Sequence, residues 1–342
     1  MQTYFRPLPQ FDPVRPVDAV PLAGGWCWFD RVEVLRRGRA PELIAAHELP
    51  GDVRARLSAP RPPLAGLTLE RPRIMGILNA TPDSFSDGGA HYGQTRAIDH
   101  ARAIAQAGAD ILDIGGESTR PGAADVSLDE EIARTAPVIS AARAEGLSLP
   151  VSIDTRKAAV ADAAFAAGAD ILNDVAALGF DPDLAALAAR TGVPVCLMHA
   201  QGAPATMQDD PRYEDVLLDV YDFLSERVAA AEAAGIERAR LIVDPGIGFG
   251  KTVAHNLALL RGLSLFHALG CPLLLGASRK SFIGALTGAE GGAARAPGSI
   301  AVALAAVAQG VQILRVHDVA ETVQALTLWS AVNTPPSPAP PG

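Results

Sequence analysis

The sequence has few cysteines and few aromatic residues. Its three cysteines, Cys27, Cys196 and Cys271, lie far apart and match no metal-ligand spacing. Cys196 and Cys271 lie within or beside apolar runs, so we expect buried structural thiols and a cytoplasmic protein. Aromatic residues make up 5% of the chain, which argues against an aromatic-lined binding groove.

Positive charge is also scarce. The chain has 29 lysines and arginines against 38 aspartates and glutamates, a net charge of −9. This balance argues against a general nucleic-acid or membrane-surface binder. An anionic substrate would need a local cationic pocket within an acidic protein.

Export and membrane signals are missing as well. The first ten residues have neither the basic start nor the apolar core of a secretory signal. The longest uncharged run, residues 296–314, is interrupted by Pro297, Gly298 and Gly310. We interpret it as a short helix followed by a buried strand, and not as a membrane span.

What the chain does contain, from Arg73 onward, is a repeated unit of apolar run, polar loop and Ala-rich helical stretch. The eight apolar runs cover residues 73–79, 110–115, 150–154, 170–174, 194–198, 241–244, 272–276 and 311–315. They are apolar throughout, as in parallel strands that are buried on both faces. The pattern predicts a (β/α)8 TIM barrel over residues 71–332. An open, doubly wound sheet is the alternative, because periodicity alone does not show closure.

The two ends of the chain fall outside this pattern. Residues 1–70 are rich in proline and arginine, and we expect a short appended segment, one hairpin packed against the barrel, whose role the sequence does not define. Residues 333–342, NTPPSPAPPG, predict a Pro-rich disordered tail.

Polar residues interrupt or follow most of the apolar runs at the C-terminal end. They follow most of the predicted strands at or just past the C-terminal end: Asn79, Asp154, Asn173 with Asp174, Asp244, Ser278 to Lys280, and Arg315 with His317. In a barrel these ends form one rim, where active sites are built. Any one of these residues could instead cap the next helix, but recurrence on most strands favours a shared pocket.

Several loops carry further candidates. The loops NATPDSFSDGGAHYG (79–93) and GGESTRPGA (115–123) are long enough to serve as lids or binding loops. The segment GIGFGKT (246–252) mimics a P-loop, but its register places Pro245 where the motif needs glycine, which argues against a nucleotide site. In GASRKSFIG (276–284), Lys280 and the amides at a helix start could hold an anion or a carbonyl oxygen.

At these segments the sequence resembles a known family. GILNATPDSFSDGG, DIGGESTRPGA, SIDTRK, ILNDV, LMHAQGAPATMQ, DPGIGFGK, GASRKSFIG and RVHDVAET appear in the order of the dihydropteroate synthases, over about residues 72–330. Ala200 and Ile247 depart conservatively from the usual residues. The resemblance implies condensation of 6-hydroxymethyl-7,8-dihydropterin diphosphate with p-aminobenzoate in folate biosynthesis, giving 7,8-dihydropteroate and diphosphate.

The resemblance also implies roles for residues around the pterin. Asp244 and Asn173 would match the hydrogen-bonding edge of the ring, Lys280 would donate to O4 and N5, and Asp154 would lie near N8. The implied pterin-binding set is Asp154, Asn173, Met198, Asp244, Phe249, Gly276, Lys280 and Arg315.

For the diphosphate, the implied contacts are Asn79, Arg120, Arg315 and His317, with Mg²⁺ bridging the phosphate oxygens to the Asn79 amide oxygen. Because an arylamine is already a nucleophile, no Ser, Cys or Lys nucleophile is needed. We infer an SN1-like step in which Asp154 offsets the cationic methylene. The implied catalytic set is Asn79, Asp87, Arg120, Asp154, Lys280, Arg315 and His317.

The p-aminobenzoate would be held where the two long loops close over the bound pterin. The implied set is Phe85, Ser118, Thr119, Pro121, Phe249, Lys280 and Ser281. Sulfonamides, which mimic p-aminobenzoate, should therefore compete, and the family implies a homodimer.

Two rival functions are weighed against this interpretation. A pterin-binding methyltransferase shares the pterin pocket but lacks the TPDSFSDGG and ESTRPG loops. A catalytically silent paralogue would bind a pterin without turnover, and the sequence retains competent residues at the motif positions. We interpret His199 as a packed, hydrogen-bonded core histidine and not as a catalyst.

Overall fold

The eight apolar runs form eight parallel strands within two residues of their predicted ranges. The computed structural model describes residues 2–80, 89–118, 125–202 and 206–333, with residues 89–94 as backbone only. The strands are β6 (Arg73–Asn79), β7 (Ile111–Gly115), β8 (Val151–Asp154), β9 (Ile171–Asp174), β10 (Val195–Met198), β11 (Leu241–Asp244), β12 (Leu274–Leu275) and β13 (Ile313–Val316).

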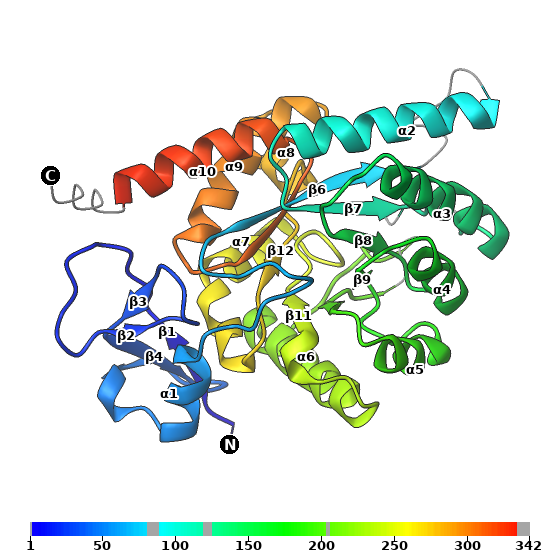
Figure 1. Cartoon of the computed structure of the whole chain (residues 1–342). Helices are drawn as coiled ribbons and strands as arrows, with labels where there is room; N and C mark the ends of the chain where they lie inside the picture. The colour runs from blue at the N-terminus through cyan, green and yellow to red at the C-terminus, as the bar shows by residue number, and fades with distance from the viewer. Residues whose placement is uncertain (1, 81–88, 119–124, 203–205, 334–342) are drawn as a thin grey trace, which may run out of the picture.

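These strands close into a barrel. Their order in the sheet is β11-β10-β9-β8-β7-β6-β13-β12, so neighbours in the chain are neighbours in space. A parallel bridge between Val243 and Leu273 joins the two ends of this order, and the Val243 amide donates to the Pro272 carbonyl at 3.0 Å. The predicted (β/α)8 barrel is confirmed, and the open-sheet alternative is wrong (Figure 1).

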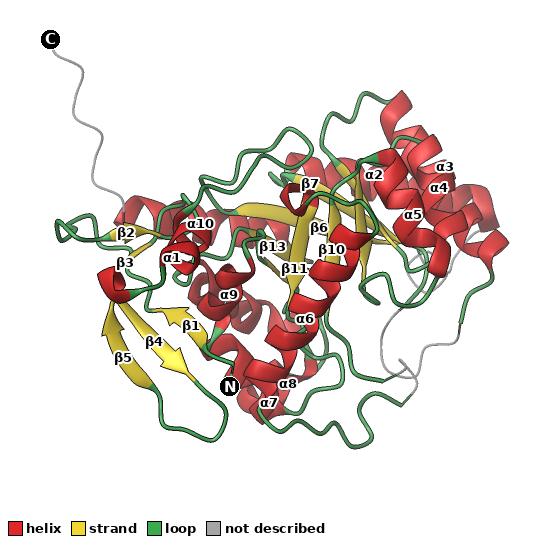
Figure 2. Cartoon of the chain, turned by 90° about the horizontal axis from the view of Figure 1, so that it is seen from below, coloured by secondary structure: helices red, strands yellow, loops and turns green. Residues whose placement is uncertain are grey.

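Helices surround the barrel and explain why the strands are apolar on both faces (Figure 2). They are α2 (Gly89–Gln106), α3 (Leu128–Ala144), α4 (Ala158–Ala166), α5 (Pro182–Thr191), α6 (Val216–Ala233), α7 (Val253–Arg261), α8 (Ser281–Thr287), α9 (Ala296–Val307) and α10 (Val319–Asn333), with short 3-10 helices η3 (Arg238–Arg240), η4 (Leu263–Leu269) and η5 (Ala293–Arg295). Local sequence fixes several helix starts. The Asp215 carboxylate caps α6 and the Thr252 hydroxyl caps α7.

Inside the barrel, residues near the N-terminal ends of seven of the strands form an apolar plug. The cluster consists of Leu64, Leu69, Met75, Ile111, Ile171, Cys196, Ile242, Leu274 and Ile313, all buried. Leu64 and Leu69 precede β6 and close the N-terminal opening. The polar residues of the same strands come later, so they lie at the opposite end of the barrel.

Residues 2–70 form more than the single hairpin expected from the sequence. A three-stranded antiparallel sheet joins β1 (Tyr4–Pro7), β4 (Arg31–Leu35) and β5 (Glu42–Ala45), and β2 (Val20–Pro21) pairs with β3 (Trp28–Phe29). The short η1 (Ala46–Glu48) and α1 (Gly51–Ser58) complete this N-terminal subdomain, drawn in blue in Figure 1. The prediction of a single hairpin was wrong because Pro and Gly divide the segment into strands of only two to five residues.

The N-terminal subdomain packs on the barrel through apolar and polar contacts. Its core includes Phe29 and Leu57, both fully buried, and reaches Ala268 of η4. The Trp26 indole donates to the Val307 carbonyl at the end of α9, at 2.8 Å. Arg37 of this subdomain pairs with two carboxylates of α6.

The remaining sequence predictions concern thiols, the uncharged run and the tail. Cys196 and Cys271 are free and buried, as expected, and Cys27 is free and buried as well. The run 296–314 forms α9 and then enters β13, which confirms its interpretation, and no helix in the described part of the chain is long and apolar enough to cross a membrane. Asn333 ends α10, and the rest of the predicted tail lies outside the described residues.

Candidate active site

The C-terminal ends of the strands surround a cleft of about 530 Å³. Nine residues proposed from sequence line it: Asn79, Ser118, Asp154, Phe249, Gly276, Lys280, Ser281, Arg315 and His317. They come from six strands or from the loops that follow them, and the first and last are separated by more than 230 positions. Closure of the barrel is what brings them together.

Three further candidates lie at neighbouring strand ends. Asp244 and Met198 are register partners on β11 and β10, and Asn173 pairs with Asp154. A Cβ at Gly276 would lie 3.5 Å from Asp244 Oδ2, which places that carboxylate directly beside the cleft. Asn173, Met198 and Asp244 are each 4% exposed and lie beneath the lining of the cleft, and we call these three residues its buried floor.

Arg315 is held by two carboxylates inside the barrel. Its Nε donates to Asp113 Oδ2 and its Nη2 to Asp154 Oδ2, both at 2.6 Å. Burial opposes the charge on Arg315, but Asp113 and Asp154 raise its pKa above the usual range. Burial raises the pKa of Asp154, against the lowering effect of Arg315 and with a further rise from Asp113.

Sequence reasoning missed Asp113. This residue is fully buried in β7, and its Oδ1 is one of the buried polar atoms without a partner among the described residues. A signal was present, because DILDIG has an aspartate in the middle of an otherwise apolar strand. A buried carboxylate at such a position requires a charged or hydrogen-bonding partner, which here is Arg315.

Asp244 has an ionisable carboxyl on the floor of the cleft. Its Oδ1 accepts a hydrogen bond from the Gly246 amide at 2.7 Å. Burial raises the pKa of Asp244 to about 6, and the Gly246 hydrogen bond together with nearby cations, Lys280 first among them, works in the opposite direction. Asp244 therefore retains its negative charge at neutral pH.

Lys280 and Phe249 face each other across one wall. The Lys280 ammonium lies 4.0 Å from the centroid of the Phe249 ring, a cation–π distance. Gly248 has φ of +84°, and a Cβ there would lie 3.1 Å from Lys280 Cδ. Glycine is thus required both for the turn and for the close passage of the lysine side chain.

His317 and Ser278 form a hydrogen-bonded pair at the rim. Ser278 Oγ lies 3.0 Å from His317 Nδ1 and accepts from the His317 amide at 3.2 Å. Arg279, which adopts a left-handed backbone conformation with φ of +57°, forms an ion pair with Asp318. Both Arg279 and Lys280 line the cleft, and the ion pair with Asp318, just before α10, holds the Arg279 head.

The second long loop is anchored at both ends by a buried ion cluster. Lys157 Nζ donates to Glu117 Oε1 at 3.0 Å, to the Val126 carbonyl at 2.6 Å and to Glu131 Oε2 at 2.7 Å. Five sequence candidates, Phe85, Asp87, Thr119, Arg120 and Pro121, lie outside the described residues.

His199 is a buried core residue, as expected from the sequence. It is 5% exposed and packs edge-on against Phe223, with 4.8 Å between ring centroids. Its Nδ1 lies 2.9 Å from Lys251 Nζ. Burial and the neighbouring Lys251 lower the pKa of His199 to about 3, so the ring is neutral.

Asn79, at the end of β6, is the metal contact proposed from sequence. Among the described residues, no group of three or more His, Cys, Asp or Glu side chains could enclose a metal ion. A single amide oxygen in a cleft suits Mg²⁺ that keeps most of its water and binds substrate phosphates. It does not suit a metal held by a protein cage.

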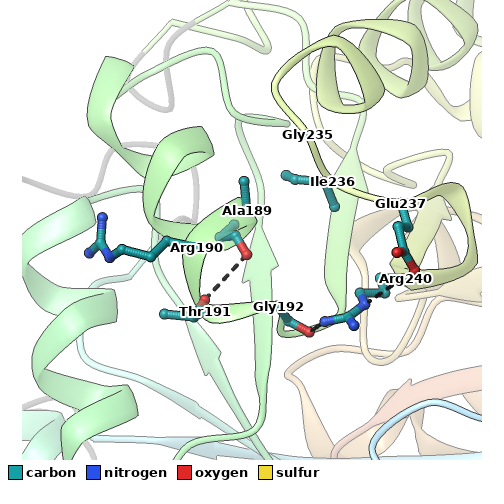
Figure 3. A pocket seen from close by; sticks show the side chains of 9 residues that line it. Ala189, Arg190, Thr191, Gly192, Gly235, Ile236, Glu237 and Arg240 are labelled. Atoms are coloured by element: carbon teal, nitrogen blue, oxygen red, sulfur yellow. Dashed lines mark hydrogen bonds and ion pairs between the residues drawn. The ribbon is translucent and has the colours of Figure 1, made fainter.

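A second hollow of about 350 Å³ lies beyond the N-terminal ends of β10 and β11 (Figure 3). It is lined by the end of α5 and the segment 235–240. Arg240 lies across it, donates to the Gly192 carbonyl and approaches Glu237 at 3.7 Å. The contacts of Arg240 stabilise the local structure, and none of the residues proposed as catalytic or substrate-binding lines this hollow.

Comparison with known proteins agrees with the geometry. A family model described as pterin binding enzyme matches residues 75–317. The dihydropteroate synthase of Escherichia coli strain K12 is 49% identical over 265 residues, covering 78% of this chain and 93% of the relative.

Solved structures agree as well. Xanthomonas albilineans dihydropteroate synthase with 4-aminobenzoic acid has a TM-score of 0.76 and 52% identity, over 81% of this chain and 99% of that chain. The Yersinia pestis enzyme in a sulfonamide drug complex has a TM-score of 0.74 and 49% identity, over 79% of this chain and 98% of that chain. This chain therefore belongs to the pterin-binding enzyme family, among the dihydropteroate synthases.

Proposed function

We propose that this chain condenses 6-hydroxymethyl-7,8-dihydropterin diphosphate with p-aminobenzoate to give 7,8-dihydropteroate and diphosphate. The observation that carries the proposal is the division of the cleft. Its rim has the cationic or polar groups Arg315, His317 and Asn79. Beneath its lining lie the buried hydrogen-bonding groups Asp244 and Asn173, with Asp244 Oδ2 beside Gly276 of the cleft wall. The floor suits a flat heterocycle, and the rim suits an anion attached to it.

The pterin edge alternates donors and acceptors, and the floor can match it. The ionised Asp244 accepts from N3–H and the 2-amino group, and the Asn173 amide pairs with N1 and the same amino group. Lys280 donates to O4 and N5 from the opposite wall. Because these groups are buried, a ring with the wrong pattern would leave them unpaired, which gives strong discrimination.

The rim would hold the diphosphate through Arg315, His317 and Asn79, with Arg120 added from the second loop. Nε and Nη2 of Arg315 already pair with Asp113 and Asp154, so Nη1 is the donor that we assign to the ligand. Asn79 would hold Mg²⁺, which when bound neutralises charge on the phosphate oxygens.

We assign the stabilisation of the developing cation to Asp154. As the diphosphate departs, positive charge appears on the methylene and spreads into the dihydropterin ring. The Asp154 carboxylate lies beside Asn173 at the end of β8, where the family pattern places N8. The buried carboxylate is held in place by Arg315, so it needs no reorganisation during the reaction.

The second substrate would enter from the Ser281 side. The p-aminobenzoate carboxylate would lie near Ser281 at the start of α8, with its ring against Phe249 and Lys280. The loop candidates Phe85, Asp87, Ser118, Thr119 and Pro121 would complete this site. The arylamine of p-aminobenzoate then attacks the cationic methylene, which forms the C–N bond and releases one N–H proton to water. The carboxylate of p-aminobenzoate is the group that a sulfonamide would mimic.

Two properties of the whole protein belong to the same proposal. We propose a homodimer, supported by the exposed apolar side chains Leu286 on α8 and Leu328 and Val332 on α10, which are 56%, 66% and 75% exposed. We also propose a cytoplasmic location, supported by three free, buried thiols. Light scattering after size exclusion would test the dimer.

The activity is tested by diphosphate release with both substrates and Mg²⁺ present. We expect stoichiometric dihydropteroate and diphosphate, with competition by a sulfonamide. Tight pterin binding without turnover would contradict the proposal and indicate the silent paralogue.

The ionising step has its own test. Without p-aminobenzoate, the enzyme should release diphosphate slowly, and oxygen label at the bridging position should scramble in recovered substrate. Asn79→Ala should slow release by about 10²–10³-fold, because negative charge on the leaving group loses its partner. Neither scrambling nor release without the amine would favour direct displacement and remove the role of Asp154.

A further inference from the structure

The sequence contains 29 lysines and arginines, but only three of them are lysine: Lys157, Lys251 and Lys280. All three follow the C-terminal end of a barrel strand, namely β8, β11 and β12. Every other cation in the chain is arginine. A compact ammonium with three donors fits narrow buried sites that a planar guanidinium cannot enter, so lysine at these positions indicates a need for that shape.

Lys157 anchors the second loop and Lys280 lines the cleft, which leaves Lys251 without an assigned role. Lys251 is 3% exposed and lies behind the cleft wall. Its Nζ contacts His199 Nδ1 at 2.9 Å, the Phe249 carbonyl at 2.9 Å and the His199 carbonyl at 3.4 Å. No carboxylate is among its hydrogen-bond partners in the described part of the chain, so its charge is not neutralised by direct contact.

These contacts connect Lys251 with both sides of the pterin site. The Phe249 carbonyl that it binds belongs to the residue whose ring lies under Lys280. The His199 amide donates to the Asp244 carbonyl at 3.0 Å. The loop between Asp244 and Lys251 packs so closely on the backbone after β10 that its glycines leave no room for a side chain. A Cβ at Gly246 would lie 1.8 Å from the His199 carbonyl oxygen, and one at Gly250 would lie 2.4 Å from the Gln201 carbonyl oxygen.

We propose that Lys251 is a positioning residue for pterin binding, which orients Phe249 through its backbone and places a positive charge behind Asp244. The inference rests on the proposed function, because it concerns the pterin floor. Lys251 touches no substrate in this arrangement. It acts through Phe249 and Asp244, which do.

Electrostatics supports this geometry. Lys251 lowers the pKa of Asp244, as do Lys280 and Arg315, against the rise caused by burial. In return, the Asp244 charge counteracts the burial that lowers the pKa of Lys251 to about 7. Other titratable or charged groups surround Asp244 and Lys251. They are Cys196 in β10, His199 directly after β10, His255 in α7, Lys280 in the β12–α8 loop and Arg315 in β13.

The test is the pH dependence of binding of 6-hydroxymethylpterin, measured by calorimetry from about pH 5 to about pH 8. In the parent enzyme, affinity should fall as Asp244 takes up a proton near pH 6. Lys251→Met should move this midpoint upward by about one pH unit, which weakens binding by up to about tenfold between the two midpoints. Lys251→Arg keeps the charge, so its midpoint should stay near that of the parent even if the larger head weakens binding at every pH.

A matched control is Arg61→Met, which removes another buried cation. Arg61 is 8% exposed and donates to the Arg56, Ala59 and His267 carbonyls beneath the N-terminal subdomain. It should lower stability and leave the midpoint unchanged. An unchanged midpoint in Lys251→Met would overturn the proposal and reduce Lys251 to a packing role.

If Lys251→Met does not fold, the parent enzyme provides the readout. Lysine labelled with carbon-13 at Cε should give three signals, one for each lysine. The Lys251 signal should show its own titration near pH 7 and a further step at the midpoint of pterin affinity near pH 6, where Asp244 ionises. A Lys251 signal without the step near pH 6 would contradict the inference. Diphosphate release by the parent enzyme tests the proposed function separately, so the two failures remain distinguishable.

Discussion

The two ends of the barrel are built from the same eight strands and have opposite contents. At the N-terminal end, residues near the starts of seven of the strands form the apolar plug closed by Leu64 and Leu69. At the C-terminal end, the buried Asp113 and the partly buried Asp154 and Arg315 form a charged group, and Asp244 keeps a carboxylate on the floor of the cleft. The N-terminal end stabilises the fold through apolar burial. The C-terminal end contains charged groups whose burial is unfavourable until a ligand binds.

This contrast indicates that stability and binding can be changed separately. The plug consists of apolar side chains without chemical function, so mutations there should act on unfolding alone. The charged end has raised carboxyl pKa values, which mean that ionisation costs stability in the folded protein. The predictions below test this separation, from the largest expected effect to the smallest.

Ile242→Ala should give the largest loss of stability. Ile242 is fully buried in the plug, so truncation removes buried area and leaves a cavity, at a cost of about 2–5 kcal/mol. Urea unfolding would measure it, and pterin affinity in the folded fraction should stay within about twofold. A large change in affinity would show that the two ends are coupled.

Asp244→Ala should abolish most pterin binding, with a loss of about 2–4 kcal/mol, because several ring donors lose their acceptor in a buried site. Calorimetry with a pterin analogue measures it. The matched control is Asp174→Ala at the end of β9. The Asp174 carboxylate accepts from the Ala176 and Leu178 amides, so that variant should lower stability and spare affinity. Unchanged affinity in Asp244→Ala would remove Asp244 from the site.

Stability and pterin affinity should respond to pH in opposite directions. Burial raises the pKa of Asp244 from 3.8 to about 6. The stability that this group contributes is therefore fully present below about pH 4 and is lost as pH rises through about 6, whereas affinity grows over the same range. Asp244→Asn should gain about 1–3 kcal/mol of relative stability between pH 4 and pH 7, measured by urea unfolding. If the unfolding free energies of the parent and Asp244→Asn changed equally with pH, the raised pKa assigned to Asp244 would be wrong.

Arg37→Ala should have the smallest effect. Arg37 joins the N-terminal subdomain to α6 through Asp219 at 2.6 Å and Asp222 at 2.8 Å, with the three side chains 26–29% exposed. Such pairs contribute about 0.5–1 kcal/mol to the free energy of unfolding. Arg36→Ala is the control, since among the residues that the structure describes Arg36 forms an ion pair with the 60% exposed Glu42 alone. A change in pterin affinity would show that the subdomain acts on the cleft.

Much of the barrel could be predicted from sequence because parallel strands covered by helices must be apolar on both faces. Polar residues then stand out, as Asn79, Asp154 and Asp244 do. The N-terminal subdomain was harder to predict. Its strands of two to five residues contain too few positions for a periodic pattern, and their pairing joins segments such as β1 and β4 that lie far apart in the chain.

Part of the site was also beyond the sequence. Asp113 and Arg315 are separated by about 200 positions, and only strand order makes them an ion pair. In the sequence, Lys251 belongs to a segment that mimics a P-loop. Only the tertiary structure brings it into contact with His199 and the Phe249 carbonyl. Pairs of this kind depend on which side chains meet inside a closed barrel.

The sequence by itself determined the strand and helix pattern, the family and the residue types at the rim, because these follow from local periodicity and motif order. The tertiary structure alone decided closure, through the bridge between Val243 and Leu273. It also decided the ionisation of Asp154 and Asp244, because a pKa depends on burial and on charges that approach from distant parts of the chain.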